Sequence, residues 1–290
     1  MDLGAFHIPD PPAGLREPHV LAMLRPWVDV GSVGAMALTE LEHALGAQPL
    51  GQLAKPGRFF DFTRYRPNSY FVDGVRNVDV PNTFLRYARG PEANDFIILR
   101  MMEPHNNSED YVESVMAVMD EFSAKRYVLM GAMYDLVPHT RPLQISGSSS
   151  NMSIQETLHK YGVRTSTYEG PTTILTQIPQ LAAARGMETL NMLVRLPQYA
   201  PLDEDYAGKL KMLEVLSEIY GITLDLKETR SKAEDQLRQV STAVEANPQL
   251  KRALTHLEER YDARGKPERA VVDPPTPLPP AIEQFLRELD

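Results

Sequence analysis

Short apolar runs alternate with segments of helical spacing along most of this chain, and this alternation limits the possible folds more than any other feature. The apolar runs have the length and composition of buried strands, at residues 19–24, 95–102, 127–134 and 188–196. Segments with apolar residues at helical spacing follow them, at 35–45, 108–122, 154–161 and 203–220. Because strands that alternate with helices usually pair in parallel, the pattern predicts a layered α/β domain with a largely parallel sheet.

A different pattern separates the first helix from the run at 95–102. Residues 52–62, 70–80 and 83–88 have the composition of consecutive strands, with turn residues between and within them. We therefore expect an antiparallel insertion or sheet edge here.

The two ends of the chain differ from this central part. Residues 1–18 carry four prolines without apolar periodicity, which predicts an irregular tail. Apolar residues spaced by four and three on both sides of Asn247-Pro248 predict a helical hairpin with a narrow apolar seam over 227–264. The sequence then predicts a Pro-rich linker and a short amphipathic piece over 265–290, which leaves 19–226 as the α/β domain.

Composition excludes several classes of protein. With no cysteine, the chain has no disulfide, no thiolate nucleophile and no Cys-based metal site. A net charge of −9 argues against nucleic acid or an anionic membrane as a partner. Since no apolar run approaches the roughly 18 residues of a membrane span, we expect a cytoplasmic, soluble protein.

Conventional catalytic motifs are missing as well. The sequence has no GxGxxG, Walker A, HExxH or GxSxG pattern, and its seven histidines lack the spacing of metal ligands. We therefore expect no metal and no cofactor, and the absence of a recognisable catalytic set favours a protein that is not an enzyme. Candidate residues come instead from four loops at expected strand ends, where α/β proteins bind ligands.

The first two loops each allow two interpretations. Asp29 and Gly31 precede a helix, where backbone N–H groups could bind an anion, although a cap of that helix by Asp29 or Ser32 is the interpretation we favour. Glu103 follows the run at 95–102 directly. It could act as a general base or bind a ribose hydroxyl, or it could accept hydrogen bonds from a neighbouring loop.

The third loop contains His139 and Arg141 between two prolines. A guanidinium on a stiff loop suits a carboxylate or phosphate ligand, and the imidazole could move a proton. The alternative, which we favour, is an ion pair of Arg141 with Glu103 or Asp135 that braces two loops.

Hydroxyl groups and a glycine follow the third loop before a predicted helix. Three of these serines, Ser146, Ser148 and Ser149, are candidates for an anion-binding nest. The fourth loop, 168–173, has the Gly-Pro-Thr composition of a capped turn before a helix.

Taken in order, these loops resemble the PAC2 family, named for proteasome assembly chaperone 2. The matching motifs are Trp27-Val28-Asp29-Val30-Gly31, Arg66-Pro67 followed by Asp73-Gly74, Glu103-Pro104, Pro138-His139-Thr140-Arg141-Pro142, Tyr168-Glu169-Gly170-Pro171 and Leu196-Pro197-Gln198-Tyr199-Ala200. The resemblance covers about residues 20–220, and the helical extension resembles that of the longer bacterial members.

The resemblance implies a single three-layer α/β domain of the nucleoside phosphorylase/hydrolase-like kind, with a twisted mixed sheet. It also implies a homo-oligomer, with a trimer favoured. Eukaryotic and archaeal relatives help to assemble or bind the proteasome, often through a C-terminal hydrophobic–Tyr–any tripeptide. This sequence has Leu289 in the place of that tyrosine, so we do not expect proteasome docking by that route.

Two functions are consistent with these observations. The first is a PAC2-like protein-interaction or assembly factor without established catalysis, whose partner surfaces are the hairpin seam and residues 282–289. The alternative is a small-molecule or anion-binding enzyme or sensor that uses a crevice between Asp29, Glu103, Arg141 and the serines, by analogy with the fold. A third possibility is that the loop residues only hold the oligomer together.

Overall fold

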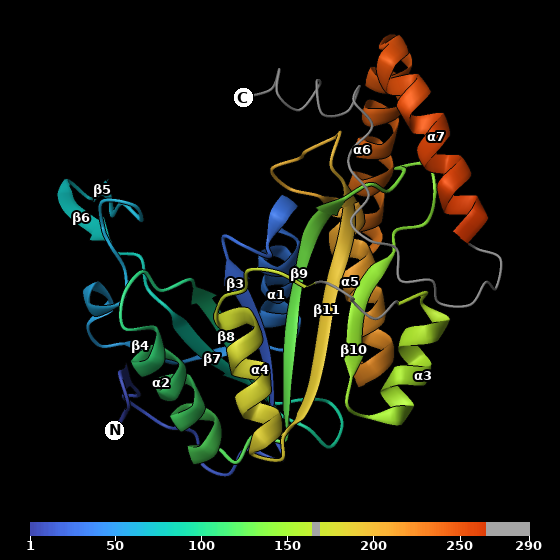
Figure 1. The fold of residues 1–290 in the computed structure, drawn as a ribbon. Coiled ribbons are helices and arrows are strands. Elements are labelled where there is room, and N and C mark those ends of the chain that lie inside the picture. The colour runs from blue at the N-terminus through green and yellow to red at the C-terminus, as the bar shows by residue number, and fades with distance from the viewer. Residues whose placement is uncertain (164–168, 265–290) are drawn as a thin grey trace.

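Nine strands form one mixed sheet through the centre of the computed structural model, which describes residues 1–163 and 169–264 (Figure 1). In sheet order they are β1 (Asp2–Leu3), β2 (Phe6–His7), β4 (Gln48–Leu53), β7 (Phe84–Ala88), β8 (Phe96–Met102), β3 (His19–Arg25), β9 (Arg126–Asp135), β11 (Glu188–Pro197) and β10 (Ile145–Ser149). The four central strands, β8, β3, β9 and β11, are mutually parallel, and the strands outside them pair antiparallel. The α/β class and the mixed sheet are therefore as predicted, with the parallel pairing confined to the four central strands.

Helices cover both faces of this sheet. On one face lie α2 (Ser108–Glu121) and α4 (Ile174–Ala184), and on the other lie α1 (Val33–Ala44), α3 (Met152–Lys160) and α5 (Tyr206–Tyr220) (Figure 1). Two further helices, α6 (Lys227–Ala246) and α7 (Pro248–Arg264), form the predicted hairpin after the sheet is complete. No helix within the described residues has the length and apolar character needed to cross a membrane.

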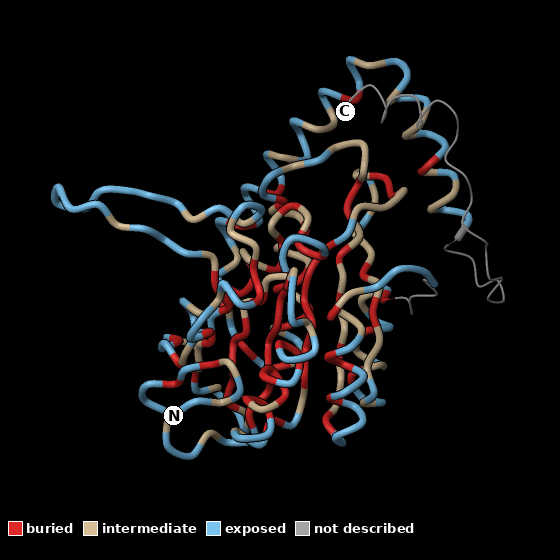
Figure 2. Tube along the Cα trace, turned by 60° about the vertical axis from the view of Figure 1, so that its left-hand side comes forward, coloured by how far each residue is buried: buried red, intermediate tan, exposed pale blue. Residues whose placement is uncertain are grey.

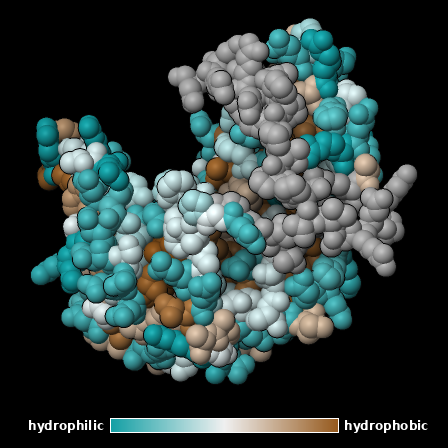
Figure 3. All heavy atoms as spheres, in the orientation of Figure 1, coloured by the Kyte–Doolittle hydropathy of each residue, from teal (hydrophilic) through white to brown (hydrophobic). Residues whose placement is uncertain are grey.

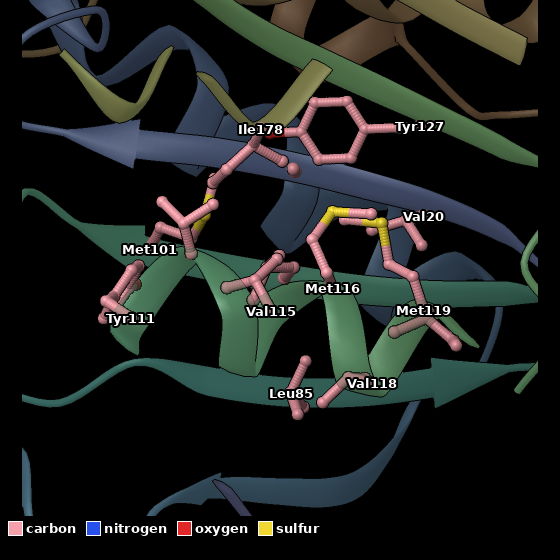
Figure 4. Close-up of a cluster of buried hydrophobic side chains, with 14 of the residues drawn as sticks. Val20, Leu85, Met101, Tyr111, Val115, Met116, Val118, Met119, Tyr127 and Ile178 are labelled. Carbon is pink, nitrogen blue, oxygen red and sulfur yellow. The ribbon is translucent and has the colours of Figure 1, made fainter. Parts of the chain in front are cut away.

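The continuous apolar character of the central strands follows from this layering. In β3, Val20, Ala22 and Leu24 point to the face covered by α2, whereas Leu21 and Met23 point to the face covered by α1 and α5. Since both faces are covered, side chains of either parity are buried. Figure 4 shows the first of these two cores, where the methionines and valines of α2 lie over the sheet.

The beginning of the chain differs from the predicted irregular tail. Its first residues form β1 and β2, and β2 pairs with β4. Phe6 and Ile8 are wholly buried. These short strands give β4 a partner for its outer backbone groups, which would otherwise form an open edge of the sheet.

The antiparallel insertion is present, but its strands are divided differently. The segment predicted as one strand at 52–62 holds the end of β4 and a 3₁₀ turn at Pro56–Arg58. The segment at 70–80 belongs to two strands, β5 (Asn68–Val72) and β6 (Val75–Asp79), joined by a turn at Asp73 and Gly74. Both turn residues have positive φ, the conformation of tight hairpin turns. We call β5 and β6 together the arm, which projects from the body and is exposed along most of its length (Figure 2).

Candidate functional site

The loops that hold Asp29, Glu103 and Arg141 lie together at the carboxyl ends of the parallel strands. Because β3, β8 and β9 are parallel, the segments with Asp29, Glu103 and Arg141 all leave from their carboxyl ends.

Asp29 caps helix α1, as the favoured interpretation predicts. Its buried carboxylate accepts hydrogen bonds from the backbone N–H groups of Gly34 (2.7 Å) and Ala35 (3.1 Å). Burial raises the pKa of Asp29, although these two hydrogen bonds oppose the shift. Gly31 is packed tightly, since a side chain there would collide with Asp205, whose N–H donates to the carbonyl of Gly31 at 2.8 Å. The carboxylate of this loop therefore caps α1.

The cap gives a testable difference between two substitutions of Asp29. Asp29→Ala removes the acceptor and is expected to lower the free energy of unfolding by about 1 kcal/mol. Asp29→Asn keeps an acceptor oxygen and has no buried charge, so it is expected to change the stability little. Urea denaturation at neutral pH measures both values, and an equal loss in the two variants would contradict the cap.

Glu103 lies at the start of α4. Its side chain accepts hydrogen bonds from the hydroxyl of Thr173 and the N–H of Ile174, the N-cap and first residue of that helix. Burial raises the pKa of Glu103, and the two hydrogen bonds partly offset this shift. Of the two interpretations of Glu103, the structure therefore has the one in which it accepts hydrogen bonds from a neighbouring loop. Thr173 also caps α4 through its own side chain, as the composition of the fourth loop predicts.

Arg141 is held by helix α7. Its Nε and Nη2 donate to the two carboxylate oxygens of Asp262 at 2.9 and 2.8 Å, and its Nη1 donates to Glu258 at 3.1 Å. The hydrogen bond with Asp262, together with the two negative charges, raises the pKa of Arg141 above its ordinary value. This geometry is the bidentate arrangement in which a guanidinium binds a carboxylate most specifically.

The partners of Arg141 differ from those predicted. We expected Glu103 or Asp135, but Glu103 belongs to the start of α4 and Asp135 forms an ion pair with Arg195. The actual partner Asp262 is 121 residues away in sequence. The bracing role is therefore present, but it joins the loop after β9 to the helical hairpin and not to another strand-end loop.

Further hydrogen bonds hold the hairpin on the same loop. The hydroxyl of Thr140 donates to Glu258, and the hydroxyl of Tyr261 donates to the carbonyl of Pro142 at 2.9 Å. Glu258, Tyr261 and Asp262 thus lie on one side of α7 and contact three consecutive loop residues. We call this set of contacts the α7 clamp. A sequence signal for it existed in the two acids spaced by four residues in a helix, but the spacing alone did not identify their partner.

His139 has partners for both ring nitrogens. The hydroxyl of Tyr199 accepts from the backbone N–H of His139 at 2.8 Å and lies 2.6 Å from its Nδ1. The other ring nitrogen, Nε2, lies 3.1 Å from the hydroxyl of Ser241 on α6, so each ring nitrogen shares a hydrogen bond with a hydroxyl group. Burial lowers the pKa of His139 and so favours the neutral imidazole. His139 joins the loop, the segment after β11 and the hairpin.

The serines lie in a strand. Ser146, Ser148 and Ser149 belong to β10, which runs antiparallel to β11. Ser149 pairs with Leu190, near the amino end of β11 and far from the loops at its carboxyl end. The sequence predicted a loop here because hydroxyl residues and glycine are typical of turns. The helix that follows is capped by Asn151, whose side chain accepts from two N–H groups of its first turn. The serines therefore lead away from Arg141.

A cavity of about 370 Å³ opens beside two of the candidates. It lies between the loop after β9, the segment after β11, α5 and α6, and His139 and Arg141 form part of its wall. Most of the remaining wall is apolar: Pro142, Leu143, Pro197, Ala200, Leu202, Ala207, Leu210, Ala233, Leu237 and Val240. Among the candidates that the structure describes, only His139 and Arg141 share this space, and both already have protein partners.

Comparison with known proteins is consistent with this architecture. A solved protein of unknown function from Corynebacterium glutamicum has a TM-score of 0.77 and 19% identity, covering 90% of this chain and 98% of that one. A proteasome-assembly chaperone homologue from Mycobacterium tuberculosis has a TM-score of 0.72 and 21% identity, with coverages of 81% and 99%. A PAC2 family protein from Streptomyces avermitilis has a TM-score of 0.72 and 22% identity, with coverages of 82% and 99%.

These identities establish a shared fold, and the assignment to a family comes from the sequence itself. No curated protein matches the chain. The model of the PAC2 family matches residues 23–244, which takes in the end of β3, every later strand of the sheet and most of α6. The match contains the loops at Asp29, Glu103 and Arg141, so the motifs of the sequence and the architecture of the structure agree that this chain belongs to the PAC2 family.

Proposed function

We propose that this protein is a protein-interaction or assembly factor, and the observation that carries the proposal is the exposed apolar surface of the arm. Phe71 and Val75 are each 64% exposed, and Tyr70, Val72 and Val78 are also exposed. In Figure 3 the arm stands clear of the rest of the surface. Exposed apolar surface of this extent usually marks a site of interaction with another protein.

The register of the arm places these side chains on both of its faces. Val72 pairs with Val75 on one face, which also carries Tyr70, whereas Phe71 and Val78 point to the other face. An isolated two-stranded hairpin is marginally stable in water. A partner that covers both faces would supply the packing that the body of the protein does not.

Family membership supports the same class of function. One solved relative is described as a proteasome-assembly chaperone homologue, which is consistent with an assembly-factor role. We include in the proposal a homo-oligomer, with a trimer favoured by the family resemblance, and a cytoplasmic location. The amphipathic piece at 282–289, which the sequence also suggested as a partner surface, lies outside the described residues.

The test replaces apolar residues of the arm without touching the body. Phe71→Ser with Val75→Thr is expected to lower partner or self-affinity by about tenfold or more, because each buried large apolar side chain contributes about 1.5–3 kcal/mol. The readouts are the molar mass by light scattering and recovery of crosslinked partners from the native cell. The thermal midpoint should stay unchanged, since the arm is outside the core.

A matched control uses exposed apolar residues elsewhere. Met152→Ser with Leu181→Ser changes two exposed side chains on α3 and α4 and should leave mass and partners as in the parent. If the arm variant and the parent show the same mass and the same crosslinked partners, the proposal is wrong.

A further inference from the structure

The apolar seam of helix α6 is packed at its two ends and open in its middle. Ala233 and Val244 are buried, whereas Leu237, between them, is 44% exposed and Val240 is only partly buried. Leu237 and Val240 both line the 370 Å³ cavity. The hairpin therefore leaves an unfilled apolar space between itself and the body.

The basic groups around this space already have partners in the protein. Arg141 is bound by the α7 clamp, and Arg230 pairs with Glu214 at 2.9 Å. Lys211 donates to the carbonyl of Tyr161 at 3.3 Å and lies against its ring. A cavity whose basic groups are already bound in this way and whose wall is mostly apolar suits an apolar occupant more than an anionic one.

The chain itself has a segment that fits this description and starts near the cavity. Helix α7 ends at Arg264, two residues after Asp262, which is bound to Arg141 in the cavity wall. Residues 265–281 follow and are rich in proline, and a Pro-rich linker of this length reaches up to roughly 50 Å at about 3.1 Å per residue. The next residues place Ile282, Phe285 and Leu289 at helical spacing.

We propose that the segment 282–289 of this chain packs its apolar side chains into the cavity between α5, α6 and the loop after β9, against Leu237 and Val240. The segment would fill the open middle of the α6 seam in the way that an amphipathic helix fills an apolar groove. The linker keeps the segment at a high effective concentration, so that few contacts are enough to hold it. This proposal is independent of the function proposed for the arm.

The absence of cysteine makes a crosslinking test direct, because introduced thiols have no competitors. In the full chain, Leu237→Cys with Phe285→Cys is oxidised at low protein concentration and the disulfide peptides are identified by mass spectrometry. The control is Leu181→Cys with Phe285→Cys. Leu181 is 39% exposed, similar to Leu237, but it lies on α4 at the opposite face of the sheet.

The proposal predicts an intramolecular disulfide with residue 237 in clear excess over residue 181. Equal yields in the two variants would overturn it. A disulfide found only between two chains would also overturn it, in favour of a second copy as the occupant.

A second measurement does not require a disulfide to form. In the full-length Leu237→Cys variant, the rate of thiol labelling is compared with and without Phe285→Asp. Loss of one buried phenylalanine from the segment is expected to speed labelling by about tenfold. An unchanged rate would mean that something other than this segment, or nothing, covers Leu237, and would overturn the proposal.

Discussion

Replacement of Asp95 by alanine is expected to lower the free energy of unfolding by about 3 kcal/mol, the largest effect that we predict for a single side chain. The carboxylate of Asp95 has no exposed surface. It accepts from Arg16 through the backbone N–H and the guanidinium, from Arg89 at 2.6 Å, and from the N–H of Gly90 at 3.1 Å. Without it, the N–H groups of Arg16, Arg89 and Gly90 lose their shared acceptor, and the segment before β3 loses its attachment to the loop before β8.

Equilibrium denaturation of the variant measures this effect, and an exposed ion pair provides the control. Asp120 pairs with Arg185, and both side chains are well exposed. Asp120→Ala is therefore expected to cost no more than about 1 kcal/mol. Similar losses for Asp95→Ala and Asp120→Ala would contradict the role that we assign to burial.

The same carboxylate gives the stability a dependence on acid. Burial by itself would raise the pKa of Asp95, but the hydrogen bonds from Arg16, Arg89 and Gly90 outweigh it and hold the pKa well below its usual range. Since the folded-state pKa is lowered, this contribution is complete above the unfolded value of about 3.9 and is lost as the pH falls further. The stability difference between the parent and Asp95→Ala should therefore shrink below about pH 4. A constant difference down to pH 2 would contradict the assignment.

Charge reversal at Arg141 is expected to release helix α7 while the sheet stays folded. Arg141→Glu places a third carboxylate beside Asp262 and Glu258 and removes the bidentate contact of the α7 clamp. We expect amide hydrogen exchange in Pro248–Arg264 to rise by roughly tenfold, with no change in β9. Exchange measured by mass spectrometry on the corresponding peptides tests this result.

A control and a rescue separate the clamp from a general effect of charge. Arg238→Glu makes the same change at an exposed position of α6, where the arginine contacts only the neighbouring Asp235 among the described ion pairs, and it should leave α7 protected. Arg141→Asp combined with Asp262→Arg restores one opposite-charge pair and should recover part of the protection. If Arg141→Glu leaves the exchange of α7 unchanged, the clamp does not hold the helix.

The parts of the fold that sequence could predict are those specified by local patterns. The central strands are apolar on both faces, and the seams of α6 and α7 repeat with helical spacing, so neither depends on knowing a distant partner. The cap by Asp29 is equally local, because the acceptor and the two donors lie within six residues. The first two strands were missed because two-residue strands have no periodicity to detect.

The candidate site was harder to predict because its contacts join distant parts of the chain. Arg141 was identified as a residue in need of an anionic partner, but Asp262 is one of many exposed-looking acids in the sequence. The serines of β10 have the composition of a loop, and only the pairing with β11 shows them to be a strand. The arm was predicted as one strand although its Asp73-Gly74 turn is a known hairpin signal.

The position of β3 in the sheet has a consequence for how the chain folds. This early strand lies between β8 and β9, both of which come much later in the sequence. During synthesis β3 is made before β8 and β9, so it can pair with them only later. The chain segments that must close to form these parallel pairs are long. Folds with such non-local pairing form slowly and expose apolar strand edges while they do so. A protein proposed to assist the assembly of others would therefore itself pass through a vulnerable stage before its central sheet is complete.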